Sequence, residues 1–166
     1  YRKQVQQLDE YFSEFALIKY RVIVEIDYFI FLADKKFFKL PAKAKTFLLD
    51  LKDNFSEADA KTIKEIEATT NHDVKAVEYF LKIQLDKANC SDLKEWIHFG
   101  LTSQDINNTA IPLSWKNSME FDYLPALINL MQHIQDLAVT WKNVPLLART
   151  HGPVSYTHLR AHETVL

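Results

Sequence analysis

Residues 5–33 read VQQLDEYFSEFALIKYRVIVEIDYFIFLA and are the longest stretch of helical periodicity in this sequence of 166 residues. Apolar side chains recur here at intervals of three and four residues, the spacing of one face of an α-helix. These side chains are Leu8, Phe12, Phe15, Val22, Ile26, Phe29 and Ile30. The pattern predicts one long helix over about 5–33, with one side facing a core.

The same stretch argues against a membrane span. Its most apolar part, 15–32, carries Lys19, Arg21, Glu25 and Asp27, a charge density that a membrane-spanning helix does not tolerate. The formal net charge of −2 gives no basic footprint for nucleic acid or an anionic lipid surface. We therefore expect neither a nucleic-acid partner nor a membrane partner.

The rest of the sequence predicts an all-α fold. Two glycines and five prolines are too few for the turns of a β-sandwich or barrel. Pro41 is expected to open a second helix, and Ser56 with Asp59 resembles a capping box. Pro112 is expected to kink or end a helix, and another helix should run from about Pro125 to Trp141.

Cysteine usage bears on the cellular compartment. Cys90 is the single cysteine, so an internal disulfide framework and a cysteine-rich metal site are both excluded. No signal peptide is visible in the sequence. These observations favour a reducing compartment and predict a cytoplasmic protein.

Three short polar stretches interrupt the helical pattern. They read TTNHD at 69–73, HFGLTSQD at 98–105 and RTHG at 149–152, and the two glycines of the chain lie in the last two of them. Glycine permits a positive φ and a close approach of backbone. The stretches therefore suggest a site built where helices end, with Asn71 or Asp73 capping the helix that follows the first of them.

The residues alone leave the roles of these stretches open. A glycine turn that leads into Thr102 and Ser103 at a helix start can bind a carboxylate or phosphate, yet an ordinary N-cap is the commoner explanation. His151 could serve as a general acid or base near neutral pH, although an isolated histidine is more often a surface or structural residue. The same applies to His72 and His98. The spacing of the histidines gives no support for a metal site.

Taken together, four segments resemble the adenylosuccinate lyases of the fumarase/aspartase superfamily. They are YRVIVE at 20–25, EATTNHDVKAVEYF at 67–80, WIHFGLTSQDINN at 96–108 and PLLARTHG at 145–152. The NHDVKAVEY run at 71–79 is the most specific element and is closest to the bacterial branch, whereas TSxD and THG occur across the superfamily. The resemblance covers nearly the whole chain, up to residue 152.

The resemblance implies an activity. The family eliminates fumarate from adenylosuccinate to give AMP, and from the related succinyl-carboxamide ribotide. A base removes the proton next to a carboxylate and an acid protonates the leaving nitrogen, and neither a cofactor nor a metal is needed. Donors arranged around the carboxylate that gains charge lower the barrier of such an elimination.

The resemblance also assigns residues. It implies that His151 is the general acid and that Thr102 and Ser103 bind the succinyl group of the substrate. The remaining expected substrate contacts are Tyr1 near the nucleotide phosphate, the substrate-lining Asn71, His72 and Asp73, and His98 as a substrate-contacting or supporting histidine.

Other features of the family point to a fragment. Its catalytic base is a serine on a loop of the form SSxMPxKxN, which these 166 residues do not contain. Family active sites combine residues from three subunits of a homotetramer, so we expect this chain alone to be inactive. The expected organisation is an N-terminal helical domain over 1–109, the start of the central bundle over 110–152, and an atypical tail over 153–166 that departs from the family and suggests a non-native end.

Two alternatives remain at this point. Another lyase of the superfamily, such as one acting on argininosuccinate, would share the general elements, although the run at 71–79 argues against it. A truncated, non-catalytic helical module that only binds a partner belongs to a different class. Specific binding of AMP or adenylosuccinate would distinguish an enzyme fragment from such a module.

Overall fold

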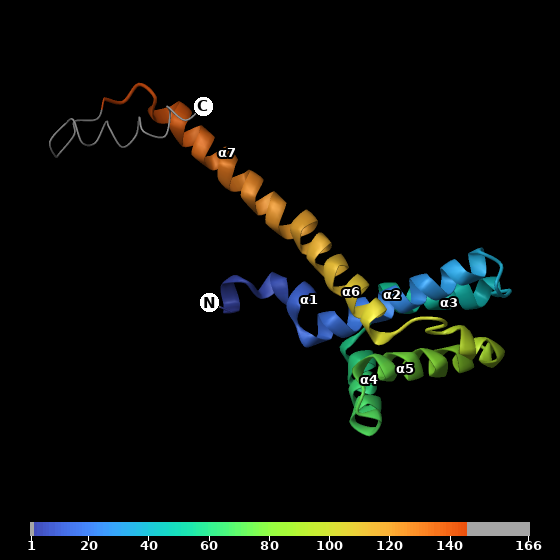
Figure 1. Ribbon diagram of the computed structural model, residues 1–166. Coiled ribbons are helices and arrows are strands. Elements are labelled where there is room, and N and C mark those ends of the chain that lie inside the picture. Colours follow the sequence, from blue (N-terminus) through green and yellow to red (C-terminus); the bar gives the residue numbers. More distant parts are fainter. Residues whose placement is uncertain (1, 146–166) are drawn as a thin grey trace. The chain divides into compact units, whose positions relative to one another are not determined.

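The computed structural model describes residues 2–145, and in this part of the chain every regular element is helical. The α-helices are α1 (Asp9–Phe12), α2 (Glu14–Asp34), α3 (Ala42–Asp53), α4 (Glu57–Thr70), α5 (Asp73–Lys87), α6 (Ser103–Ser118) and α7 (Leu124–Trp141). A 3₁₀ turn, Ser91–Trp96, lies between α5 and α6, and a π-helical segment, Met119–Tyr123, lies between α6 and α7. The predicted all-α fold is confirmed (Figure 1).

The prediction of one continuous helix over 5–33 is wrong at Ser13. Ser13 has an extended backbone, with ψ at 168°, and its hydroxyl accepts a hydrogen bond from the Ala16 N–H. A serine that satisfies a free N–H in this way favours a new helix start over a continuous helix. Short helical turns and α1 therefore precede Ser13, and the long helix α2 begins at Glu14.

Other local predictions can be compared directly with the helix bounds. Pro41 immediately precedes α3, and Ser56 with Asp59 forms the expected capping box, so both predictions are confirmed. α7 closely matches the helix predicted around Pro125. Pro112 does not end its helix, because α6 continues to Ser118.

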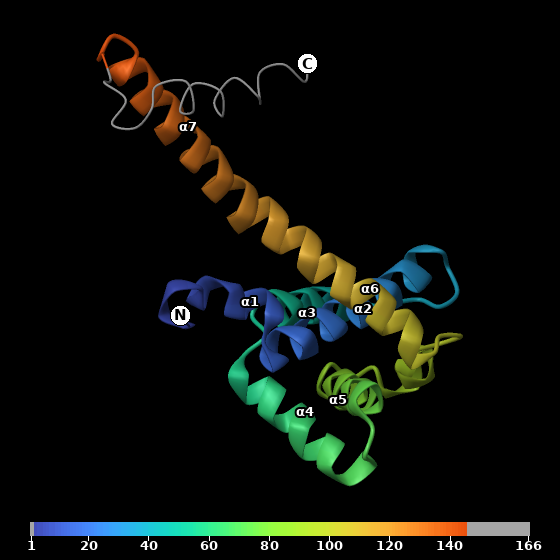
Figure 2. The same ribbon diagram turned by 60° about the vertical axis from the view of Figure 1, so that its left-hand side comes forward.

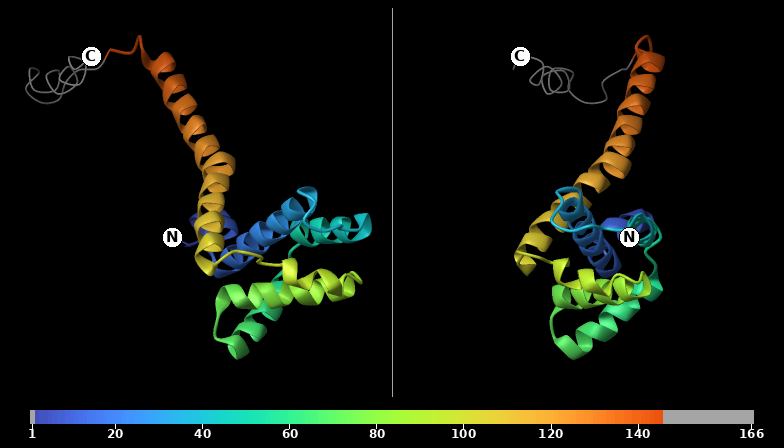
Figure 3. Two further views of the ribbon diagram at one scale, coloured as in Figure 1. Left: turned by 45° about the vertical axis from the view of Figure 1, so that its right-hand side comes forward. Right: turned by 90° about the vertical axis from the view of Figure 1, so that its right-hand side faces the viewer.

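Helix α2 is the centre of the unit formed by residues up to Pro125. It packs against α1, α3, α4, α5 and α6, and Figure 2 shows α6 lying across it. The segment that joins α5 to α6 runs back between α2 and α5, as Figure 3 shows. This return path brings the second polar stretch, 98–105, against α2.

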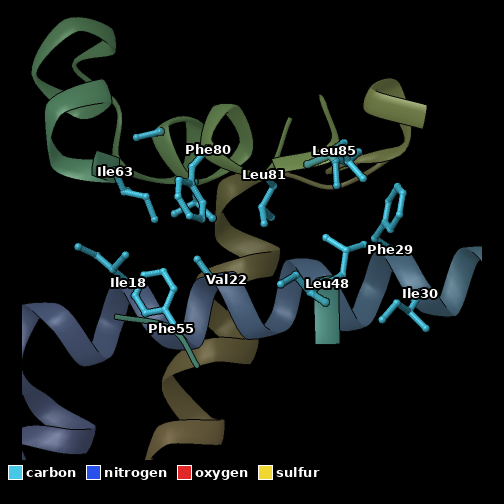
Figure 4. Close-up of a cluster of buried hydrophobic side chains, with 14 of the residues drawn as sticks. Ile18, Val22, Phe29, Ile30, Leu48, Phe55, Ile63, Phe80, Leu81 and Leu85 are labelled. Atoms are coloured by element: carbon cyan, nitrogen blue, oxygen red, sulfur yellow. The ribbon is translucent and has the colours of Figure 1, made fainter. Parts of the chain in front are cut away.

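The core lies between α2 and the helices that cover it. Ile18, Val22 and Phe29 of α2 meet Phe80 and Leu81 of α5 in the cluster of Figure 4. Phe29 and Phe80 are almost fully buried, and burial of side chains of this size contributes about 1.5–3 kcal/mol each. The cluster therefore fixes α2 and α5 against each other, and with them the polar residues that they carry.

The described residues beyond Pro125 form a separate unit consisting of most of α7 and the turn after it. None of the residues of α7 is buried. The domain boundary expected between residues 109 and 110 falls within α6, and the proposed division into domains stays a prediction. No helix within 2–145 combines the length and apolarity needed to cross a membrane.

Candidate functional site

The first polar stretch forms the junction between α4 and α5. Asn71 ends α4 in the left-handed conformation, at φ 51°, which asparagine tolerates better than most residues. His72 is the N-cap of α5, and its Nδ1 accepts a hydrogen bond from the Lys75 N–H at 3.2 Å. The expectation that Asn71 or Asp73 caps this helix is therefore wrong, because the imidazole satisfies that free N–H instead.

The second polar stretch begins α6 with a capping box, in which Thr102 is the N-cap. The backbone N–H and the hydroxyl of Thr102 donate to the Asp105 carboxylate at 2.7 and 2.8 Å. These bonds, from the N–H first and the hydroxyl second, lower the pKa of Asp105. Gly100 has φ +70°, and a side chain there would meet open space, so the backbone conformation alone favours glycine.

The two stretches meet at their helix starts. His72 Nε2 lies 3.4 Å from the Ser103 hydroxyl. Because His72 Nδ1 accepts from Lys75, the neutral ring carries its proton on Nε2, which can donate to that hydroxyl. The N-termini of α5 and α6 thus place two predicted substrate-binding residues in contact, although 31 positions separate them in sequence.

Arg21 of α2 forms hydrogen bonds to both of these helices. Its guanidinium donates to Asp73 Oδ2 at 2.6 Å and to Asn107 Oδ1 at 2.9 Å, and its side chain is only 8% exposed. Burial raises the pKa of Asp73, but the Val74 N–H and the Arg21 charge outweigh that effect and lower it. Asp73 is therefore charged, and one of its carboxylate oxygens, Oδ2, is bound by Arg21.

Two further residues of α2 hold the loop before α6. Glu25 Oε1 lies 2.5 Å from His98 Nδ1, and the Tyr28 hydroxyl donates to the Phe99 carbonyl at 3.0 Å. Arg21, Glu25 and Tyr28 are spaced as neighbours on one face of a helix. This polar face of α2 therefore supports both the start of α5 and the approach to α6.

The expected site residues do not all have the same freedom to bind a ligand. Thr102 gives both of its protons to Asp105, and Asp73 is paired with Arg21. Asn71 is exposed at the junction, and the Ser103 hydroxyl has only the long contact to His72. Ser103 is thus better able than Thr102 to donate a hydrogen bond to a carboxylate.

Tyr1 and His151, the expected phosphate neighbour and general acid, lie outside the described residues. Within 2–145, no three histidine, cysteine, aspartate or glutamate side chains gather as a metal site requires. The sequence reasoning missed Arg21, Glu25 and Asn107 as parts of this arrangement. The signal available for the first two was a pair of opposite charges four residues apart inside an apolar helical stretch.

These features define the class of the protein: an all-α domain with a polar cluster built at two helix starts. A family model described as "Lyase" matches residues 32–160, and the chain belongs to this family. The similar proteins named adenylosuccinate lyase include those of Dictyostelium discoideum, 52% identical over 160 residues, Vibrio cholerae, 46% over 157, and Escherichia coli K12, 43% over 157.

Each of these alignments covers 92% of this chain and 34% of the relative. The chain therefore spans about a third of the length of the curated relatives that it matches. The resemblance to adenylosuccinate lyases that the sequence motifs indicated is confirmed by these comparisons.

Proposed function

We propose that this chain forms part of the active site of a lyase that eliminates fumarate from adenylosuccinate, giving AMP, and from the succinyl-carboxamide ribotide. One structural observation carries the proposal. His72 and Ser103, from two of the segments that resemble the family, lie side by side at the starts of α5 and α6. The names of the similar proteins support the choice of substrate.

The chemistry of the cluster suits a dicarboxylate substrate. The first N–H groups of a helix lack partners within the helix, and the helix dipole adds partial positive charge there. In the proposed complex, Ser103 donates to a succinyl carboxylate with support from Thr102, and His72 donates from Nε2. Asn71 and Asp73 line the same side, and His98 contacts the substrate or supports a residue that does.

The remaining steps involve residues outside the described part. We propose that His151 protonates the leaving nitrogen, that Tyr1 lies near the nucleotide phosphate, and that the base comes from a segment absent from these 166 residues. We also propose that the whole protein is a cytoplasmic homotetramer that works without a cofactor. Residues 1–109, 110–152 and 153–166 would then be the N-terminal domain, the start of the central bundle and an atypical tail.

Calorimetric titration of the purified chain with AMP, adenylosuccinate and argininosuccinate tests the proposal. We expect binding of the two adenine nucleotides. Ser103→Ala should weaken the binding of adenylosuccinate about tenfold or more, because it removes one hydrogen bond to the succinyl carboxylate, which AMP lacks. Thr46→Ala, an exposed hydroxyl on α3, is the control and should leave binding unchanged. Binding of argininosuccinate alone would favour the other lyase, and binding of none of the three would favour a non-catalytic module.

A further inference from the structure

Glu25 is an acidic residue buried among apolar side chains. It is fully buried on α2, where Val22, Ile26 and Phe29 on nearby turns belong to the core. One carboxylate oxygen, Oε1, contacts His98 Nδ1 at 2.5 Å, and the other, Oε2, has no hydrogen-bond partner among the described residues. Among the described residues, His98 is therefore the only hydrogen-bond partner of the Glu25 carboxyl group.

We do not expect such an arrangement to strengthen the fold. Burial is the main cause that raises the pKa of Glu25, and the bonds with His98 oppose it. A buried polar atom without a partner is unfavourable, and an apolar side chain of similar volume is often at least as stable in such a position. The position of Glu25 is therefore explained by its contact with His98 rather than by the packing of α2.

His98 is held at several points. Its backbone has φ 60°, in the left-handed region, and the next peptide is bound through the Phe99 carbonyl by Tyr28. Its side chain is 15% exposed. Within 2–145, its Nε2 has no hydrogen-bond partner, so the ring is fixed through Nδ1 and leaves Nε2 available.

We propose that Glu25 is a positioning residue that fixes the ring and the protons of His98, so that Nε2–H can donate to a bound ligand. This inference rests on the proposed function for the ligand itself. When Glu25 and His98 share two protons, one lies between Oε1 and Nδ1, whichever atom holds it, and the other is on Nε2. The carboxyl group thus selects the donor form of Nε2.

Acidic side chains of α5 and α6 interact electrostatically with the pair. Glu78 of α5 faces Glu25 and adds a smaller contribution that raises its pKa. Glu78 is itself paired with Lys75 at 2.8 Å and Lys82 at 3.1 Å. Asp105 of α6 interacts with His98 electrostatically, so acidic side chains of both α5 and α6 lie near the pair.

The experiment combines three measurements on the 166-residue chain and its variants Glu25→Met and Glu25→Gln. Nitrogen-15 NMR of the His98 ring reports which nitrogen is protonated, urea unfolding reports stability, and titration with AMP reports binding. Glu78→Gln is the matched control, because it neutralises a buried glutamate that does not touch His98.

We expect a strongly downfield proton shared between Glu25 Oε1 and His98 Nδ1 in the unaltered chain and in Glu78→Gln, and its loss in Glu25→Met. The Glu25→Met chain should unfold at the same urea concentration or a higher one, yet bind AMP about tenfold more weakly. Glu25→Gln retains a hydrogen-bonding group and should bind AMP with intermediate affinity. This variant still tests the inference if the methionine variant folds poorly.

Two results would overturn the inference. One is an unaltered chain that shows no hydrogen-bonded proton between Glu25 Oε1 and His98 Nδ1, and the other is tight AMP binding by both Glu25 variants. If the unaltered chain does not bind AMP at all, the proposed function fails. The ring spectrum and the unfolding curves then still decide whether Glu25 holds His98.

Discussion

Replacement of Arg21 by methionine should destabilise the fold more than any comparable change of a surface cation. The guanidinium makes two hydrogen bonds, to Asp73 at 2.6 Å and to Asn107 at 2.9 Å, from a side chain that is 8% exposed. Methionine retains most of the packing of the arginine stem but leaves both acceptors without their donor.

The expected loss follows from these contacts. A hydrogen bond to a charged group contributes about 1.5–3 kcal/mol to stability. The sum for two such bonds is the upper limit of the loss in unfolding free energy. The Asp73 side chain is 46% exposed, so water can rehydrate its carboxylate when Arg21 is removed, which reduces the loss. We therefore expect the free energy of unfolding to fall by about 2–3 kcal/mol.

Urea unfolding at constant pH and salt measures this loss. The control is Lys45→Met, which removes an exposed pair with Asp34 at 2.9 Å and should change the unfolding free energy by less than about 1 kcal/mol. An Arg21→Met chain as stable as the Lys45→Met chain would refute the view that Arg21 holds the starts of α5 and α6 together.

The pH dependence provides a second check on the same pair. The pKa of Asp73 is lowered in the folded chain, so its contribution to stability is present above its unfolded pKa of about 3.9. That contribution is lost as the pH falls through the folded pKa. The stability difference between the unaltered chain and Arg21→Met should therefore be largest near neutral pH and shrink below about pH 4.

Three further predictions concern other parts of the structure. Thr102→Ala removes the hydroxyl of the capping box and should lower the unfolding free energy by about 1 kcal/mol, measured by urea denaturation; no change would contradict the cap. Gly100→Ala should cost about 1 kcal/mol from backbone strain at φ +70°, and a gain in thermal stability would show that the conformation is not required. Cys90 is 4% exposed and burial raises the pKa of its thiol, so a thiol reagent should label it only on unfolding; rapid labelling of the native chain would contradict its burial.

The sequence predicts the local features of this fold well where the signal lies within a few residues. The capping residues Ser56 and Asp59 form the bonds that their spacing indicates, and Thr102 begins α6 as an N-cap. The helix after Pro125 likewise follows from its periodicity. Ser13 shows the limit of this approach, because periodicity continued across it while its hydroxyl began a new helix.

The tertiary contacts of the site could not be predicted in the same way. Arg21 reaches Asp73 and Asn107 across 52 and 86 positions, and Glu25 reaches His98 across 73. Such pairs depend on how α5 and α6 pack on α2, which a local pattern does not encode. The charges of Arg21 and Glu25 were informative against a membrane helix, whereas their roles became evident only from the packed structure.

The roles assigned to Tyr1 and His151 depend on residues and subunits beyond the described part. The reading frame that contains this chain therefore bears directly on the proposal. A downstream SSxMPxKxN segment in frame would supply the expected base, whereas a stop codon directly after Leu166 would reduce the likeness to one of ancestry. The nucleotide sequence of that reading frame would also establish whether residues 153–166 belong to the natural protein.

The most direct measurement of the central claim is fumarate release by the product of that complete reading frame. The proposal predicts turnover of adenylosuccinate to AMP and fumarate, with loss of about 100-fold or more in His151→Ala, because a general acid contributes at least that much. Turnover should also fall in Ser103→Ala. Turnover of argininosuccinate but not of adenylosuccinate, or full activity of His151→Ala, would contradict the account.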